Sequence, residues 1–388
     1  MSTKPQVDPV TLSQWLGQEH PPTPQQAAII GAPPGPMLVV AGAGAGKTET
    51  MAARVVWLVA NGYCAPEQVL GLTFTKKAAQ QLSQRIRLRL QALARVPQLA
   101  EIDPDGSIRD SLKAITPTVA TYDSYAATLI QEYGLLLPVE PGARTITQAE
   151  TYHIALEVVR QHQGTLDTTV LPGSLVNRVL RLASEMDNHV VSSQEVIDES
   201  RLLVEMVDTL PNKDPDGPTP GKPNQALLKV RDRQLDRNAL LPIVEEFRAE
   251  LKRRAVVTFG EQMSMAARLV MSHPRVGASQ RERYRVVMLD EYQDTSHSQR
   301  LLLRSLFGGV DPELSITAVG DPMQAIYGWR GATAANLPRF TRDFPDITAG
   351  TPAPKKELTT SWRNPPAVLD WANIVADAVF GTGAPRPV

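Results

Sequence analysis

The chain has 388 residues, of which 42% are hydrophobic, and its 40 basic and 41 acidic side chains nearly cancel. This length and apolar content suffice for two or three domains with their own cores. The balanced charge counts mildly against a protein that coats DNA and says little about an enzyme that contacts nucleic acid through one groove. The single cysteine, Cys64, excludes an intrachain disulfide and fits a reducing compartment. Without a signal pattern or a bilayer-length apolar run, we expect a cytoplasmic protein with no membrane partner.

Apolar, strand-like segments alternate with amphipathic helical segments through most of the chain. The first strand is expected at residues 37–41, before a glycine-rich loop, and the same order recurs in EQVLGLTFTKKAAQQL and TPTVATYDSYAATLI. Two further short apolar strands end in acids, in RYRVVMLDEYQDT and LSITAVGDPMQ. This alternation predicts an α/β fold whose parallel sheet is covered by helices on both faces. Ligands bind such sheets at the carboxyl ends of the strands, where these polar clusters fall.

Residues 135–255 have helical periodicity without the intervening strands. We interpret them as a helical insertion subdomain between the two parts of a first α/β domain, at 1–134 and 256–350. The Pro-, Gly- and Asp-rich stretch near 212–225 is expected to be a flexible surface loop. Residues 351–388 supply one more strand and one more helix, which we interpret as the start of a second α/β domain.

The run AGAGAGKT, which ends at Thr48, has the spacing of a phosphate-binding loop. Small residues let backbone N–H groups converge on phosphate oxygens, while Lys47 reaches the β- and γ-phosphates and the Thr48 hydroxyl ligates Mg²⁺. The alternative is a glycine turn with a chance lysine, but the strand before it and the helix after it favour a nucleoside triphosphate site. The expected cradle consists of Ala43, Gly44, Ala45, Gly46, Lys47 and Thr48.

VVMLDEYQDT supplies the acids that such a site needs. Asp290 is expected to hold Mg²⁺ through its water shell, and Glu291 is placed to activate the attacking water. Two solvated acids at a strand end are the alternative. A hydrolysing ATPase needs the adjacent glutamate, whereas a kinase or a small GTPase does not.

Seven segments together resemble the front part of a UvrD/Rep-type superfamily 1A DNA helicase, in family order and over residues 22–366. They are PTPQQAAII, AGAGAGKT, LTFTKKAAQQLSQRI, VATYDSYAATLI, VVMLDEYQDT, AVGDPMQAIYGWRGA and ELTTSWRNPP. PTPQQAAII, the run after the phosphate loop and SWRNPP look similar to the AdnB-type subunit of the actinobacterial AdnAB helicase–nuclease. The resemblance implies RecA-like domains, ATP and Mg²⁺ as cofactors, and single-stranded DNA and duplex junctions as partners. An AdnB-type protein would also pair with a second helicase–nuclease subunit.

The resemblance implies further roles around the nucleotide. Gln26 would bind the adenine edge, and Trp362, where relatives more often have tyrosine, would stack on the adenine. Gln324 would sense the γ-phosphate, and Arg363 would act as an arginine finger, a role worth roughly 10³–10⁵ in rate.

The resemblance also implies contacts with single-stranded DNA. Base stacking on an aromatic ring contributes about 1–3 kcal/mol and tolerates any sequence. Because Gln324 lies close in sequence to the rings of Tyr327 and Trp329, one element could report loss of the γ-phosphate to the DNA. Ordinary core packing is the alternative for these two rings. The implied DNA-binding residues are Thr73, Phe74, Thr75, Thr121, Tyr327, Trp329 and Arg330.

Besides Trp362, the chain departs from the family pattern at three places. Asp123 stands where relatives usually have a histidine, and a carboxylate there would repel a DNA phosphate. Glu49 replaces the arginine that many relatives carry after the phosphate loop, so adenine packing must rely on other groups. TFGEQM, residues 258–263, replaces a segment that usually begins with an acid.

The later motifs of the family's second domain have no match before Val388. We therefore expect a fragment of an ATP-dependent 3′ to 5′ DNA helicase of repair or recombination, weakly active or inactive by itself. Double-strand break end processing is expected if the parent is AdnB-like. A non-catalytic nucleotide- and DNA-binding module, an RNA helicase and a phosphate-loop kinase stay open as alternatives.

Overall fold

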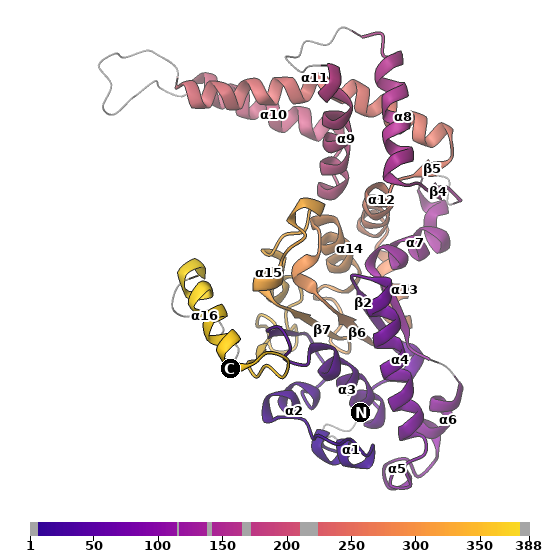
Figure 1. Ribbon diagram of the computed structural model, residues 1–388. Helices are drawn as coiled ribbons and strands as arrows, with labels where there is room; N and C mark the ends of the chain where they lie inside the picture. The colour runs from indigo at the N-terminus through magenta and orange to yellow at the C-terminus, as the bar shows by residue number, and fades with distance from the viewer. Residues whose placement is uncertain (1–6, 115, 138–141, 165–171, 210–223, 381–388) are drawn as a thin grey trace. The chain divides into compact units, whose positions relative to one another are not determined.

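The computed structural model describes residues 7–114, 116–137, 142–164, 172–209 and 224–380. The chain divides into two compact units (Figure 1). The first unit combines Met1–Thr128 with Val270–Val388, and the second unit is Leu129–Leu269. In the described part of the chain, no helix is both long enough and apolar enough to cross a membrane.

A six-stranded sheet forms the centre of the first unit, and all its neighbouring strands pair in parallel. The strand order is β3-β2-β6-β7-β1-β8. β1, β2, β6 and β7 are buried along their whole length, as cover by helices on both faces requires. The predicted α/β class with a parallel central sheet is therefore confirmed. The strands are β1 (Met37–Ala41), β2 (Val69–Thr73), β3 (Thr118–Thr121), β6 (Val286–Leu289), β7 (Ser315–Gly320) and β8 (Lys355–Leu358).

Side chains of a strand point alternately to the two faces of a sheet, so apolar strands offer an apolar surface to helices on both faces. Met37 and Val39 of β1 join a core that includes Trp57 of α3 and Leu82 of α4. α15 also contacts β1. The helices of the first unit are α1 (Pro9–Trp15), α2 (Pro24–Ile30), α3 (Lys47–Ala60), α4 (Lys76–Leu93), α5 (Leu99–Ile102), α6 (Ser107–Ala114), α13 (Pro274–Arg283), α14 (His297–Phe307), α15 (Asn336–Asp343) and α16 (Pro366–Phe380), with short 3₁₀ turns η1 (Pro66–Gln68), η3 (Tyr292–Asp294), η4 (Pro322–Gln324) and η5 (Gly328–Arg330). One boundary between the two units falls within α7 (Tyr122–Tyr133).

A buried arginine joins three of these elements. Arg54 lies on α3 and is 1% exposed. Its guanidinium donates to the carbonyl oxygens of Ile29 at 2.9 Å and Ala32 at 2.8 Å, and to the Thr317 hydroxyl at 3.2 Å. Burial lowers the pKa of Arg54 to about 10, far above neutrality, so the side chain keeps its charge. These bonds hold the end of α2 against α3 and β7, and α2 is the helix that carries Gln26.

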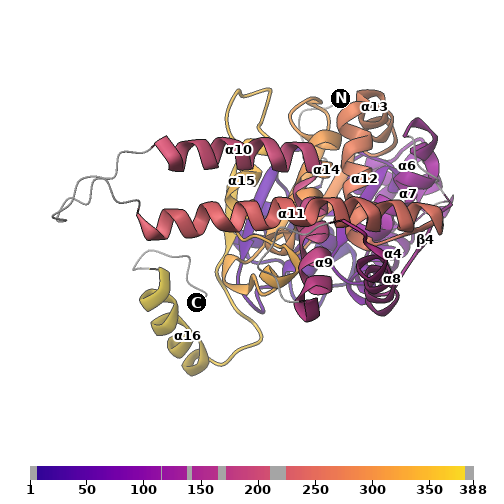
Figure 2. The same ribbon diagram turned by 90° about the horizontal axis from the view of Figure 1, so that it is seen from above.

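The second unit is built mainly from helices around an apolar core. α10 and α11 run side by side (Figure 2), and α8, α9 and α11 pack on one another. One two-residue strand, β4, occurs where the periodicity indicated helices alone, because so short a strand has no detectable pattern. Of the predicted surface loop, residues 212–223 lie outside the described residues. The elements are η2 (Gly134–Leu136), β4 (Arg144–Thr145), α8 (Gln148–Gln161), α9 (Pro172–His189), α10 (Ser193–Thr209), α11 (Gln225–Arg253), β5 (Val256–Val257) and α12 (Phe259–Ser272).

Candidate nucleotide and nucleic-acid site

The polar segments singled out from the sequence follow the carboxyl ends of neighbouring strands. The phosphate loop follows β1, the acids follow β6, and residues 321–336 follow β7. Because β6, β7 and β1 are adjacent and parallel, these three segments meet at one edge of the sheet. Below, residues 290–296 are called the acid segment and residues 321–336 the aromatic turn.

The phosphate loop packs directly against the segment that follows β8. Gly44 and Gly46 have φ of 78° and 80°, in the left-handed region that favours glycine. A Cβ atom on Gly44 would lie 2.7 Å from the Cβ of Arg363, so this close approach also requires glycine. The Trp362 backbone N–H donates to the Gly44 carbonyl oxygen at 3.0 Å. The Ser361 hydroxyl donates to the Ala43 carbonyl oxygen at 2.9 Å. The structure therefore brings Trp362 and Arg363 to the loop, and both side chains are exposed.

Gln26 also reaches the phosphate loop. Its Nε2 would lie 2.9 Å from a Cβ atom on Gly46. Its Oε1 accepts from the Thr23 backbone N–H at 3.0 Å, and the Thr23 hydroxyl accepts from the Gln26 backbone N–H at 3.2 Å. This capping box fixes the start of α2 and leaves the amide nitrogen of Gln26 facing the loop. A cavity of about 50 Å³ beside it is lined by Gln26 and Glu49, among other residues.

The acid pair lies against the phosphate-loop lysine. The Nζ of Lys47 is 3.5 Å from the Oε2 of Glu291, and Gln293 donates to the same oxygen at 2.9 Å. Glu291 has φ of 48°, an unusual conformation for a residue with a side chain. Asp290 is 4% exposed. Burial raises the pKa of Asp290 to about 7, the charge of Glu291 adds to the rise, and Lys47 opposes it.

These groups suit a magnesium ion that arrives with a nucleotide. The described residues contain no group of three or more His, Cys, Asp or Glu side chains that could hold a metal ion. Mg²⁺ at phosphate sites is usually held by one or two protein oxygens, with phosphates and water completing the shell. A buried carboxyl group such as Asp290 would recover its charge beside a divalent cation. Together with the half-buried hydroxyl of Thr48, it could supply such oxygens.

Gln324 is joined to the acid pair by a short series of hydrogen bonds. Its Nε2 donates to the Oδ2 of Asp321 at 2.6 Å, and the backbone N–H of Asp321 donates to the Oε1 of Gln293 at 3.0 Å. Gln293 in turn donates to Glu291. Gln293 was not predicted as a site residue. The one sequence feature that could have pointed to it is its place in the DEYQD run, two residues after Glu291.

Aromatic rings from two strand ends meet on the aromatic turn. The ring centroids of Phe74 and Tyr327 are 4.6 Å apart, and those of Tyr327 and Trp329 are 6.4 Å apart. The guanidinium carbon of Arg330 lies 4.7 Å from the Trp329 ring centroid, within range of a cation–π contact. Trp329 is 72% exposed, so core packing does not explain it, whereas Tyr327 is half-buried.

The three threonines of the expected DNA contact are placed differently from the rings. Thr73 is fully buried and donates to the carbonyl of Thr75 at 3.1 Å, so its side chain is not presented at the surface. Thr75 is exposed, and its hydroxyl caps the start of α4 by accepting from Ala78. Thr121 is mostly buried and bonds to Ser124.

Glu49 and Asp123, two of the residues that depart from the family pattern, have polar side-chain partners in the first unit. The Glu49 carboxylate is held by two arginines of α4, by Arg85 at 3.0 Å and by Arg89. Arg85 is thus paired with an acid. Asp123 accepts from Gln299 at 3.4 Å. Neither carboxylate is left without a partner at this edge.

Comparison with known proteins agrees with this arrangement. Residues 22–345 match the family model described as UvrD/REP helicase N-terminal domain. The chain is 27% identical over 358 residues to the ATP-dependent DNA helicase UvrD1 of Mycobacterium tuberculosis, covering 91% of this chain and 38% of that protein. It is 29% identical over 363 residues to UvrD2 of Mycobacterium bovis, covering 92% and 43%. It is 26% identical over 331 residues to a probable DNA helicase II homolog of Rickettsia felis, covering 85% and 41%. The chain thus spans about two-fifths of the length of these relatives.

Proposed function

The chain belongs to the UvrD/REP helicase family, and we propose that it forms the N-terminal motor part of an ATP-dependent DNA helicase. The observation that carries this proposal is the meeting of Lys47, Glu291 and the Asp321–Gln324 turn at one sheet edge, through contacts of 3.5 Å or less. A phosphate loop alone would fit many nucleotide-binding proteins. An adjacent acid pair and a glutamine on the next strand end are what ATP hydrolysis requires.

We assign the nucleotide chemistry to the residues at this edge. The loop backbone and Lys47 bind the phosphates, and Gln26 with Trp362 holds the adenine. Lys47 leaves Glu291 when a triphosphate enters, because the triphosphate carries more negative charge than one carboxylate. Glu291 is then held by Gln293 and accepts a proton from the attacking water.

Three more residues complete the proposed nucleotide site. Thr48 and Asp290 would hold the Mg²⁺ that accompanies ATP, and this ion would neutralise charge on the phosphates. Arg363, at the phosphate loop, is assigned to charge that develops during transfer.

We assign the single-stranded DNA to the exposed side of the aromatic turn. Tyr327 and Trp329 would stack on bases, with the Phe74 ring packed against Tyr327. Arg330 would contribute a cation beside these rings, and Thr75 would lie along the strand. Because stacking uses ring faces that every base has, this grip would not depend on base sequence.

The finer assignments are also proposals. We propose 3′ to 5′ translocation, a cytoplasmic location, a role in repair or recombination, and an AdnB-type parent with a second helicase–nuclease subunit. We assign residues 1–134 and 256–350 to the first RecA-like domain and 135–255 to a helical insertion. The start of a second RecA-like domain was expected at 351–388, but β8 pairs with β1 in the first sheet. We therefore propose that the second domain begins after Leu358. The family membership supports the RecA-like assignments, and the likeness of the quoted segments supports the AdnB type.

The deciding experiment is ATP hydrolysis by this chain, with and without an oligodeoxythymidylate, beside Lys47→Ala and Glu291→Gln. Hydrolysis that DNA stimulates and both substitutions remove is the expected result for a working site. ATP binding that depends on Lys47, without turnover, would instead favour a non-catalytic nucleotide- and DNA-binding module. Absence of ATP binding by the folded chain would overturn the proposal.

A further inference from the structure

We propose that Gln293 and Asn336 are positioning residues that fasten the two ends of the aromatic turn to the acid segment, and thereby couple nucleotide binding to DNA binding. The inference rests on the proposed function, because it needs both ligands. Neither residue stood out in the sequence, and neither is required to touch nucleotide or DNA. Each acts through the groups that it holds.

Gln293 fastens the first end of the turn. It is 1% exposed, and both ends of its amide are used. Its Nε2 donates to the Oε2 of Glu291 at 2.9 Å and to the Oδ2 of Asp294 at 3.1 Å, and its Oε1 accepts from the Asp321 backbone N–H at 3.0 Å. A Cβ atom on Gly320 would lie 2.7 Å from this Oε1, so the fit is close. One buried side chain thus joins the proposed catalytic acid to the first residue of the turn.

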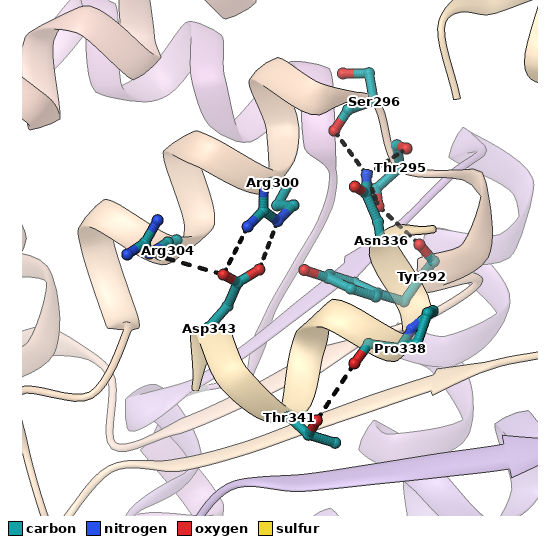
Figure 3. Close-up of polar contacts among 9 residues, drawn as sticks. All are labelled: Tyr292, Thr295, Ser296, Arg300, Arg304, Asn336, Pro338, Thr341 and Asp343. Atoms are coloured by element: carbon teal, nitrogen blue, oxygen red, sulfur yellow. Dashed lines mark hydrogen bonds and ion pairs between the residues drawn. The ribbon is translucent and has the colours of Figure 1, made fainter. Parts of the chain in front are cut away.

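Asn336 fastens the other end of the turn to the same segment (Figure 3). It is fully buried, and its Nδ2 donates to the Thr295 carbonyl at 2.9 Å, the Thr295 hydroxyl at 3.2 Å and the Ser296 carbonyl at 3.2 Å. The backbone N–H of Thr333 also donates to the Thr295 carbonyl at 3.2 Å, and Ala332 forms an antiparallel bridge with Ser296. The amide of Asn336 therefore closes a second contact between the turn and the acid segment.

The helix that follows the turn is held in place as well. Asp343, at the end of α15, receives two hydrogen bonds from Arg300 of α14, at 2.5 and 2.7 Å, and lies 3.7 Å from Arg304 (Figure 3). The Tyr292 ring meets Phe340 of α15 edge-on, with centroids 5.4 Å apart. Because α15 is fixed to α14 and to the acid segment, Asn336 has a rigid base.

Two attachments to one short segment have a mechanical consequence. The turn cannot follow a displacement of its exposed rings unless the acid segment moves with it or a buried hydrogen bond breaks. Glu291 has a left-handed backbone that its neighbours must maintain, so its carboxylate responds to such a movement. A nucleotide that draws Lys47 away from Glu291 removes an ion pair from the same acid segment, at the end that faces the phosphate loop. Binding at the two sites is therefore linked, and by linkage the effect is reciprocal.

The test measures the affinity of the chain for a fluorescent oligodeoxythymidylate, with and without a magnesium complex of a non-hydrolysable ATP analogue. The ratio of the two dissociation constants reports the coupling. In the unsubstituted chain we expect a ratio of about fivefold or more, the lower end of typical allosteric coupling. Gln293→Met keeps the length of the side chain but removes its hydrogen bonds, and we expect it to bring the ratio close to one. Affinity for each ligand alone should change little.

Gln280→Met is the matched control. Gln280 is also 1% exposed, and its amide oxygen accepts from the Tyr125 hydroxyl at 2.9 Å, away from the turn. The same loss of a buried amide should lower stability there but leave the coupling ratio intact. Asn336→Ala tests the second attachment and replaces Gln293→Met if that variant does not fold.

The outcomes separate the inference from the proposed function. A coupling ratio that survives in both Gln293→Met and Asn336→Ala overturns the inference. So does an unsubstituted chain that binds both ligands with a ratio of one. A folded chain that binds neither ligand overturns the proposed function itself.

Discussion

Each compact unit contains a buried carboxyl group whose pKa is raised to about 7. Asp290 lies at the end of β6 in the first unit, and Glu261 lies in the first turn of α12 in the second. Burial is the main cause in both cases. A nearby acid adds to the rise, namely Glu291 for Asp290 and Asp187 for Glu261, while a cationic side chain opposes it.

The surroundings of the two acids differ far more than their pKa values. Asp290 follows a parallel strand beside a phosphate loop, where a lysine and a second acid converge. Glu261 shares its site with Asp187 and Arg248, which pair with each other at 2.8 Å. A raised pKa therefore reports burial, and the position within the fold decides whether the acid serves a ligand.

Lys47→Ala should have the largest effect on the nucleotide edge. Its ammonium group is expected to make charge-assisted hydrogen bonds to the phosphates, so affinity for ATP should fall about 100-fold or more. Calorimetric titration of the chain with an ATP analogue would measure this loss. Thermal unfolding should change little, because the ion pair of Lys47 with Glu291 is a single 3.5 Å contact. Unchanged ATP affinity would contradict the assignment of the phosphate loop.

Asp290→Asn tests whether Asp290, and not Glu261, is the buried acid that serves the nucleotide and its magnesium ion. With Mg²⁺ at pH 8, affinity for the ATP analogue should fall about tenfold or more, since an amide cannot neutralise the cation. In the presence of a chelator the variant and the unsubstituted chain should bind the analogue alike. Glu261→Gln is the matched control and should bind normally under both conditions. An equal loss in both variants would remove the distinction between the two acids.

Trp329→Ala tests the proposed DNA contact of the aromatic turn, which lies at the same edge of the sheet. Loss of one stacking ring should weaken binding of single-stranded DNA about tenfold, within the 1–3 kcal/mol that such rings contribute. Fluorescence anisotropy with oligonucleotides of different composition would measure it, and the loss should be similar for all of them. A loss confined to one sequence would speak against stacking and for base-specific hydrogen bonds.

Glu261→Gln should have the smallest effect, on stability alone. The pKa of Glu261 is about 7 in the folded chain against an ordinary value of 4.5, so the folded state prefers the protonated group. The stability that this preference supplies is complete below pH 4.5 and is lost as the pH rises through 7. The glutamine variant should therefore match the unsubstituted chain near pH 4.5 and be more stable at pH 8, by roughly 1–3 kcal/mol. Urea unfolding at both pH values would show this, and equal stability at pH 8 would contradict the burial of the charge.

The match between sequence and structure is closest where the signal is local. The strand predicted at residues 37–41 is β1, and the glycines of AGAGAGKT that need positive φ are where the loop turns. The aromatic turn was found because its rings and amide are close in sequence. The roles assigned to these residues stay predictions, including the DNA contacts of Thr75 and Thr121.

The amino-acid sequence by itself determined the strand–turn–helix order, the parallel α/β class and the family, because apolar periodicity and motif spacing are local properties of the chain. Only the tertiary structure decided the strand order β3-β2-β6-β7-β1-β8 and the partners of the buried polar groups. The bonds from Gln293 to Asp321 and from Asn336 to Thr295 join residues 28 and 41 positions apart. No periodic pattern specifies such contacts. They arise because a buried polar group that lacks a hydrogen bond costs free energy, which favours folds that pair such groups across the core.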